Sequence, residues 1–209
     1  TPYRITLDDG EPLTLENVLV GEVWLASGQS NMEMPLKGFP GCCVKNGAQD
    51  IIAAADNPGV RMFTVPKDQS YEPKTDCGGR WEVGSIDNAP QFSATAYHFA
   101  TSLSRALRIP VGIINSSYGG AKVEGWISRP LLEGYPDVCL DRDSIESINP
   151  MHRPMLMYNA MLHPLQNYTI KGFIWYQGES NVGRHDTYAH RLADMVSTND
   201  LVEPYKRYN

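Results

Sequence analysis

The sequence predicts an α/β domain in which helices cover both faces of a mostly parallel β-sheet. Two observations lead to this prediction. Segments with strand character alternate along the chain with segments of helical periodicity. The strand segments are continuous apolar runs, such as Val-Gly-Ile-Ile at 111–114, and not alternating ones. Continuous runs are typical of strands buried on both faces, and their alternation with helices is typical of parallel sheets. A chain of 209 residues is long enough for one such domain.

The expected elements follow in a regular order along the chain. Residues 3–7 alternate like a strand and are followed by a turn. Apolar runs predict further strands at 18–26, 60–65, 111–115 and 170–175. Helical spacing predicts helices at 48–55, 93–107, 156–165 and 186–196. A polar loop rich in proline and glycine is expected between residue 65 and the second helix.

The composition excludes several classes of protein. Eighteen Lys and Arg residues stand against 24 Asp and Glu residues, which gives a net charge of −6. This charge repels nucleic acids and anionic membranes at long range, so we expect neither as a partner. No apolar run approaches the roughly 18 residues of a membrane span. The hydrophobic content of 42% argues against a disordered chain.

The four cysteines leave their pairing open. None of them shows a spacing typical of a zinc site, so we expect no bound metal. They are either thiols within a domain that folds without bridges, or Cys77 bonds to Cys42 or Cys43 in an oxidising compartment.

Three polar loops follow three of the expected strands. They comprise residues 27–32, 116–120 and 176–181. In open parallel sheets, ligands bind where loops leave the carboxyl ends of the strands. We therefore expect these loops to form the functional site.

The residues of the three loops suit acyl transfer. Ser30 lies on a turn after a strand, where its hydroxyl is a candidate nucleophile once a base takes its proton. Paired glycines at 119–120 allow a backbone N–H to approach a developing oxyanion. Asn181 offers an amide that is able to donate to the same oxygen. A nucleophile and two kinds of oxyanion donor together predict an esterase-like site.

The three blocks resemble a known family. Gly-Gln-Ser-Asn-Met at 28–32, Tyr-Gly-Gly at 118–120 with Glu-Gly-Trp-Ile-Ser at 124–128, and Trp-Tyr-Gln-Gly-Glu-Ser-Asn at 175–181 are similar to blocks of SGNH-type carbohydrate esterases. The nearest resemblance is to the sialate O-acetylesterase family. It extends from about residue 18 to about residue 196, and the blocks occur in the family's order.

The resemblance implies a flavodoxin-like, three-layer α/β/α sandwich that needs no metal or organic cofactor. It implies that Ser30 is the nucleophile and that the oxyanion hole consists of the Ser30 N–H, the Gly120 N–H and the Asn181 side chain. Four further residues are expected near the pocket, namely Gln29, Trp126, Gln177 and Glu179. Residues 1–17 are expected to be the remnant of a preceding β-rich segment, and residues 18–209 to be the catalytic domain.

One part of the family pattern is missing. The family's base is a histidine in an Asp-x-x-His-Pro pattern after the third block, whereas the one His-Pro pair here, His163-Pro164, precedes that block. His185 next to Asp186 is no substitute, because neighbouring side chains on a helix point about 100° apart. We therefore expect the catalytic domain to lack its C-terminal part or an internal stretch after Val196.

The expected function is removal of O-acetyl groups from sialic acid or a related glycan through an acyl-enzyme on Ser30. Two alternatives stay open. The first is an acetyl xylan esterase or another plant-polysaccharide acetylesterase, because the net charge of −6 does not favour an anionic sialate. The second is a carbohydrate-binding domain without catalysis, which the missing histidine favours. By family likeness, the protein is expected to be secreted or periplasmic.

Overall fold

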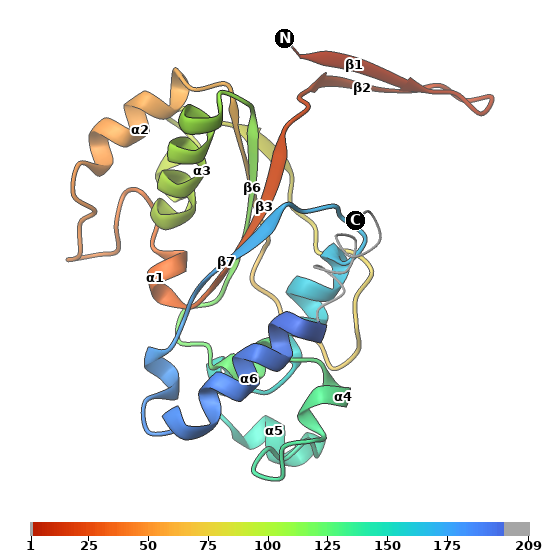
Figure 1. Cartoon of the computed structure of the whole chain (residues 1–209), viewed down its shortest axis with the longest axis vertical. Helices are drawn as coiled ribbons and strands as arrows, with labels where there is room; N and C mark the ends of the chain where they lie inside the picture. Colours follow the sequence, from red (N-terminus) through yellow and green to blue (C-terminus); the bar gives the residue numbers. More distant parts are fainter. Residues whose placement is uncertain (1, 199–209) are drawn as a thin grey trace.

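The computed structural model describes residues 2–198 and confirms the α/β class with a mostly parallel sheet (Figure 1). The five strands lie in the order β5-β4-β6-β3-β7. β3 is parallel to both β6 and β7, β4 is parallel to β6, and β5 is antiparallel to β4 at the edge. Their bounds are β3 (Glu22–Gly28), β4 (Val60–Thr64), β5 (Trp81–Val83), β6 (Val111–Ser117) and β7 (Gly172–Tyr176).

Helices of very different length connect these strands. The α-helices are α1 (Ser30–Glu33), α2 (Gly47–Ala55), α3 (Ala94–Leu107), α4 (Arg129–Leu132), α5 (Arg142–Ser147) and α6 (His185–Thr198). Short 3₁₀ turns lie at Ala89–Gln91, Val123–Trp126, Pro150–His152, His163–Leu165 and Glu179–Asn181, and a π-helical turn lies at Tyr158–Leu162. None of the helices in the described part of the chain combines the length and the apolar character that a membrane span requires.

Two hydrophobic cores lie on opposite sides of the sheet, because successive side chains of a strand point to opposite faces. In β3, Leu25 belongs to one core and Ala26 to the other. In β6, Ile114 and Ile113 divide in the same way. α2 and α3 cover the face of Ala26 and Ile113, while residues 121–165 and α6 cover the opposite face (Figure 1). The sheet therefore has helices on both faces, as the sequence predicts.

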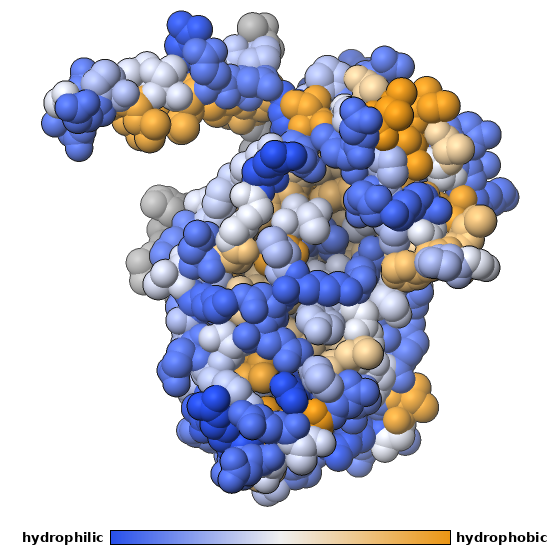
Figure 2. All heavy atoms as spheres, turned by 180° about the vertical axis from the view of Figure 1, so that it is seen from behind, coloured by the Kyte–Doolittle hydropathy of each residue, from blue (hydrophilic) through white to orange (hydrophobic). Residues whose placement is uncertain are grey.

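A separate hairpin precedes the sheet. It consists of β1 (Tyr3–Leu7) and β2 (Leu13–Val18), which pair with each other and stand away from the body (Figure 1). One face of the hairpin is apolar and exposed (Figure 2), and Ile5 and Leu13 expose 41% and 58% of their surface. That residues 1–17 are the remnant of a larger β-rich segment stays a prediction.

Several boundaries differ from the sequence prediction. The strand expected at 18–26 begins only at Glu22, because β2 ends at Val18 and the chain then passes close to Pro110 at Gly21. A Cβ at Gly21 would lie 2.1 Å from the Pro110 carbonyl oxygen. β5 was missed, because its three residues lie inside the segment expected to be a polar loop. The four cysteines all lie in the described range and are free thiols, so no Cys77 bridge is present.

Candidate active site

The three polar loops converge at one edge of the sheet. Gly28, the last residue of β3, pairs with Ser117 at the end of β6 and with Tyr176 at the end of β7. The three parallel strands therefore end side by side, and the loops that follow them meet there (Figure 1). This convergence is the arrangement that the order of the strands in the sequence predicts.

Gln29 joins the first loop to the third. Its N–H donates to the Tyr176 carbonyl at 3.0 Å, and its side-chain Oε1 accepts from the N–H groups of Gly178 and Ser180, both at 3.2 Å. The Ser180 hydroxyl in turn donates to the Gly120 carbonyl at 2.9 Å in the second loop. Gln29 is buried, so these bonds fix the relative positions of the loops.

Ser30 is the first residue of α1 and is half-buried. Its hydroxyl has no hydrogen-bond partner among residues 2–198, and its backbone N–H has no acceptor there either. Gly28 makes the preceding turn possible. Its φ is +144°, and a Cβ at this position would lie 2.1 Å from the Tyr176 carbonyl oxygen. A residue with a side chain at position 28 would therefore displace the backbone that presents Ser30.

The paired glycines of the second loop have different environments. The Gly119 N–H donates to the carboxylate of Glu33, which also forms an ion pair with Lys67 at 2.6 Å. The Gly120 N–H has no acceptor in the described structure, and its φ of +75° lies in the left-handed region. A Cβ at Gly120 would meet the sulfur of Met151 at 2.4 Å. The sequence did not indicate Glu33, which accepts from the Gly119 N–H, whereas the Gly120 N–H stays without an acceptor in the described structure.

The Asn181 amide lies in a buried polar network. Its Oδ1 accepts from the Val123 N–H at 3.0 Å and from Gln177 Nε2 at 2.7 Å. Its Nδ2 donates to Glu124 Oε2 at 2.9 Å, which leaves one of its two N–H bonds without a described acceptor. Gln177 Nε2 also donates to the Ala121 carbonyl at 3.0 Å, so both N–H bonds of Gln177 are used within the protein.

The other two expected pocket residues, Glu179 and Trp126, differ in their exposure. Glu179 is exposed, and its carboxylate accepts from the side-chain amide of Asn31 in the first loop. Trp126 is completely buried in the core and packs edge-on against Trp175, with 6.2 Å between ring centroids. Trp126 therefore has no exposed surface at the site, and its partner ring Trp175 belongs to β7.

Comparison of the sequence with models of known protein families identifies the family of this chain. Residues 20–201 match the model of the carbohydrate esterase family described as sialic acid-specific acetylesterase. The chain belongs to this family. The resemblance of the three blocks is thereby confirmed.

Individual relatives agree with the family model. Among curated proteins, the chain is 34% identical to the sialate O-acetylesterase of Rattus norvegicus and 32% identical to that of Mus musculus, over 88% of this chain and 40% of each relative. It thus spans about two fifths of the length of these relatives. Among solved structures, it is similar to a carbohydrate acetylesterase from Xanthomonas citri, with a TM-score of 0.78 and 38% identity. That match covers 94% of this chain and 42% of the other.

None of the histidines of this esterase-family chain forms a hydrogen bond with Ser30 in the described structure. The chain's five histidines all fall within the described range. His98 approaches Asp50 at 3.5 Å, and the ring of His163 bonds to the Lys74 carbonyl at 2.8 Å. His185 and His190 lie exposed on α6.

His152 follows Met151, which packs against Gly120, and it lines one cavity together with Lys122 just after the second loop. Burial, together with the nearby Lys122 ammonium, lowers the pKa of the His152 imidazole. The neutral form is therefore favoured at His152. The described residues 2–198 also hold no group of three His, Cys, Asp or Glu side chains placed to bind a metal ion.

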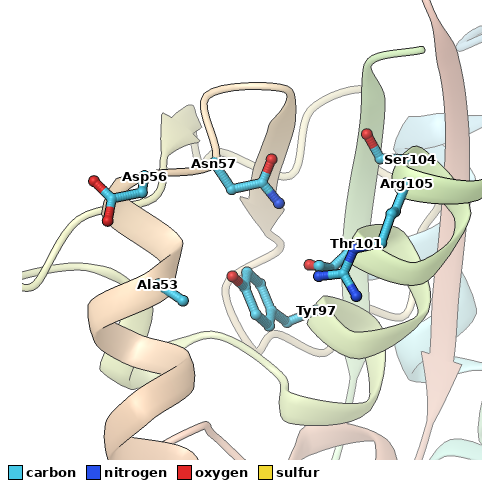
Figure 3. A pocket seen from close by; sticks show the side chains of 7 residues that line it. All are labelled: Ala53, Asp56, Asn57, Tyr97, Thr101, Ser104 and Arg105. Carbon is cyan, nitrogen blue, oxygen red and sulfur yellow. The ribbon is translucent and has the colours of Figure 1, made fainter. Parts of the chain in front are cut away.

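The cavities of the molecule differ in their distance from these loops. A cavity of about 110 Å³ is lined by Lys122, Glu124 and His152 among others, next to the second loop. A larger one of about 380 Å³ lies between α2 and α3 (Figure 3), where Asn57 and Ser104 line it. Asn57 stands just before β4 begins, so the larger cavity lies at the opposite edge of the sheet from Ser30.

Proposed function

We propose that this chain carries the nucleophile of a serine esterase that removes O-acetyl groups from sialic acid or a related acetylated glycan. Membership in the sialic acid-specific acetylesterase family supports this function. The observation that carries it is the set of unpaired groups at the carboxyl edge of the sheet. The Ser30 hydroxyl, the Ser30 N–H and the Gly120 N–H all lack partners among the described residues.

Ser30 and Gly120 are both half-buried, so polar groups there without an internal partner are available to a ligand, and several of them in converging loops favour a ligand site. A nucleophile needs a hydroxyl that is not already donating its proton elsewhere, and an oxyanion hole needs N–H groups without internal acceptors. The Gly119 N–H shows the contrast, because the Glu33 carboxylate already occupies it.

In the proposed reaction, Ser30 Oγ attacks the acetyl carbonyl carbon and loses its proton to a general base. The carbonyl oxygen becomes an oxyanion, which accepts hydrogen bonds from the N–H groups of Ser30 and Gly120 and from the remaining N–H of Asn181. The C–O bond to the sugar breaks, the sugar oxygen takes up the proton, and acetyl-Ser30 remains. Water then attacks this ester and releases acetate.

The substrate is proposed from the family rather than from the charge of the chain. A net charge of −6 opposes an anionic sialate at long range, so recognition of its carboxylate has to be local. By the same family likeness, we propose that the protein acts in a secreted or periplasmic setting.

The decisive experiment replaces Ser30 and a matched neighbour in the full-length protein. Ser30→Ala is expected to abolish hydrolysis of 4-nitrophenyl acetate and of O-acetylated N-acetylneuraminic acid. Ser27→Ala is the control, because Ser27 is fully buried and its hydroxyl has no hydrogen-bond partner in the described structure. Equal activity in the wild type and Ser30→Ala would rule out the acyl-enzyme on Ser30.

The same proteins separate the alternatives. Faster release of acetate from acetylated xylan than from the sialate would identify a plant-polysaccharide esterase. Binding of acetylated glycan by the wild type without any release of acetate would identify a carbohydrate-binding domain.

A further inference from the structure

A buried ion pair lies directly behind the Asn181 amide. Glu124 and Arg191 expose 4% and 0% of their surface, and Glu124 Oε1 accepts from Arg191 Nη1. The second carboxylate oxygen, Oε2, accepts from Asn181 Nδ2 at 2.9 Å. One carboxylate therefore joins three segments that are far apart in the sequence: the turn at Val123–Trp126, the turn at Glu179–Asn181, and α6.

The surroundings of Arg191 keep its charge in place. Its Nη2 bonds to both carboxylate oxygens of Asp137 at 2.6 Å, and its guanidinium lies 4.9 Å from the centre of the Tyr135 ring. An arginine is always charged, so the Glu124 carboxylate faces a fixed positive charge. Replacing a buried ion pair by apolar residues is often neutral for stability, so net stability alone does not account for this pair.

Orientation is the property that an amide in an oxyanion hole requires. A side-chain amide has two nearly isosteric flips, one presenting NH₂ and the other presenting the carbonyl. A carboxylate only accepts, so Glu124 selects the flip in which Asn181 presents NH₂ to it. Val123 N–H and Gln177 Nε2 only donate, and both point at Asn181 Oδ1, which selects the same flip.

We propose that Glu124 is a positioning residue that holds the Asn181 amide with its free Nδ2–H available to the acetyl oxyanion. The proposal rests on the proposed esterase function. Arg191 belongs to α6, so under this proposal the Asn181 amide is correctly oriented only when α6 is packed in place.

The test compares two variants of Glu124. Glu124→Gln allows the new amide to present NH₂ as well as oxygen, so the Asn181 flip is no longer selected. Glu124→Asp keeps the charge opposite Arg191 and shortens the reach to Asn181. For both, we expect kcat for 4-nitrophenyl acetate to fall by about 10- to 100-fold with KM within about twofold, since groups that orient a catalytic residue have effects of this size.

Two controls separate positioning from general damage. Glu146→Gln removes a matched Glu–Arg pair on the surface, where Glu146 lies 3.0 Å from Arg142 and is half-exposed, and we expect unchanged kcat. The double variant Asn181→Ala/Glu124→Asp tests the route of the effect. If Glu124 acts through Asn181, the double variant is no slower than Asn181→Ala alone.

The possible outcomes are distinct. Non-additive losses, together with unfolding temperatures close to the wild type for Glu124→Asp, support the positioning role. Unchanged kcat in a folded Glu124→Asp, or losses that multiply in the double variant, overturn it while leaving the esterase intact. A wild-type protein that releases no acetate overturns the proposed function and this inference with it.

Discussion

The glycine before the proposed nucleophile offers a sharp test of how the site is built. In Gly28→Ala, the new methyl group would lie 2.1 Å from the Tyr176 carbonyl oxygen and 2.6 Å from its carbon. Tyr176 is paired with Gly28 in the sheet and accepts from the Gln29 N–H, so it is unable to move away without breaking these bonds. The alanine would also have to adopt a φ of +144°.

Two effects add to the predicted destabilisation. A side chain at an unfavourable positive φ costs about 1–3 kcal/mol. Forcing a methyl group into packed surroundings adds about 1–3 kcal/mol. Gly183→Ala is the matched control, because Gly183 has a φ of +91° and a methyl group there would have no atom within 4 Å, which leaves only the first effect. Gly28→Ala should therefore lose about 1–3 kcal/mol more than Gly183→Ala.

Urea unfolding followed by tryptophan fluorescence measures this difference, and hydrolysis of 4-nitrophenyl acetate measures its effect on the site. We expect Gly28→Ala to lose activity even where the urea experiment shows that it is folded, because the displaced backbone carries Ser30 directly. Equal unfolding free energies for the two variants would refute the steric argument. A fully active Gly28→Ala would refute the link between this turn and the nucleophile.

Three further predictions follow from the packing and the ionisable groups. Burial and the hydrogen bond to Asp194 raise the pKa of Tyr135 to about 12, so the folded state should lose stability as pH rises from about 10 to about 12. In Tyr135→Phe, this part of the fall in melting temperature should be absent. An identical fall in the wild type and the variant would contradict the prediction. A hydrogen bond to Ser144 lowers the pKa of the exposed Cys139 thiol, whereas burial raises the pKa of the Cys77 thiol. Iodoacetamide at neutral pH should therefore label Cys139 before Cys77, and peptide mass spectrometry measures this order. Ile113→Ala should cost about 2–5 kcal/mol in urea unfolding because the side chain is completely buried, and a loss below about 1 kcal/mol would mean that the core collapses around the gap.

The sequence was sufficient to predict that the three polar loops converge. Successive apolar strands alternate with helices, so their carboxyl ends had to meet at one edge, and the structure places Gly28, Ser117 and Tyr176 side by side there. The family resemblance rested on short contiguous motifs, and such motifs are directly readable from a sequence. The roles of Ser30, Gly120 and Asn181 stay predictions until activity is measured.

The contacts behind the loops could not be predicted in the same way. Glu33 binds a glycine 86 positions away, and Glu124 binds an arginine 67 positions away. No periodicity encodes such pairs, because they depend on how separate layers pack. One signal was nevertheless present. Arg191 falls on the apolar face of α6 between Tyr188 and Met195, and a charge on a buried face requires a partner.

The proposed oxyanion donors are held by two different means. The Ser30 and Gly120 N–H groups are fixed by backbone geometry at Gly28 and Gly120, which neither salt nor moderate changes of pH alter. The Asn181 N–H depends on a buried charge pair that reaches across to α6. Loosening α6 should therefore weaken one donor and leave the other two in place. Such a change would lower kcat by no more than the loss of one oxyanion donor does, which is about 10²- to 10³-fold, and would not abolish activity.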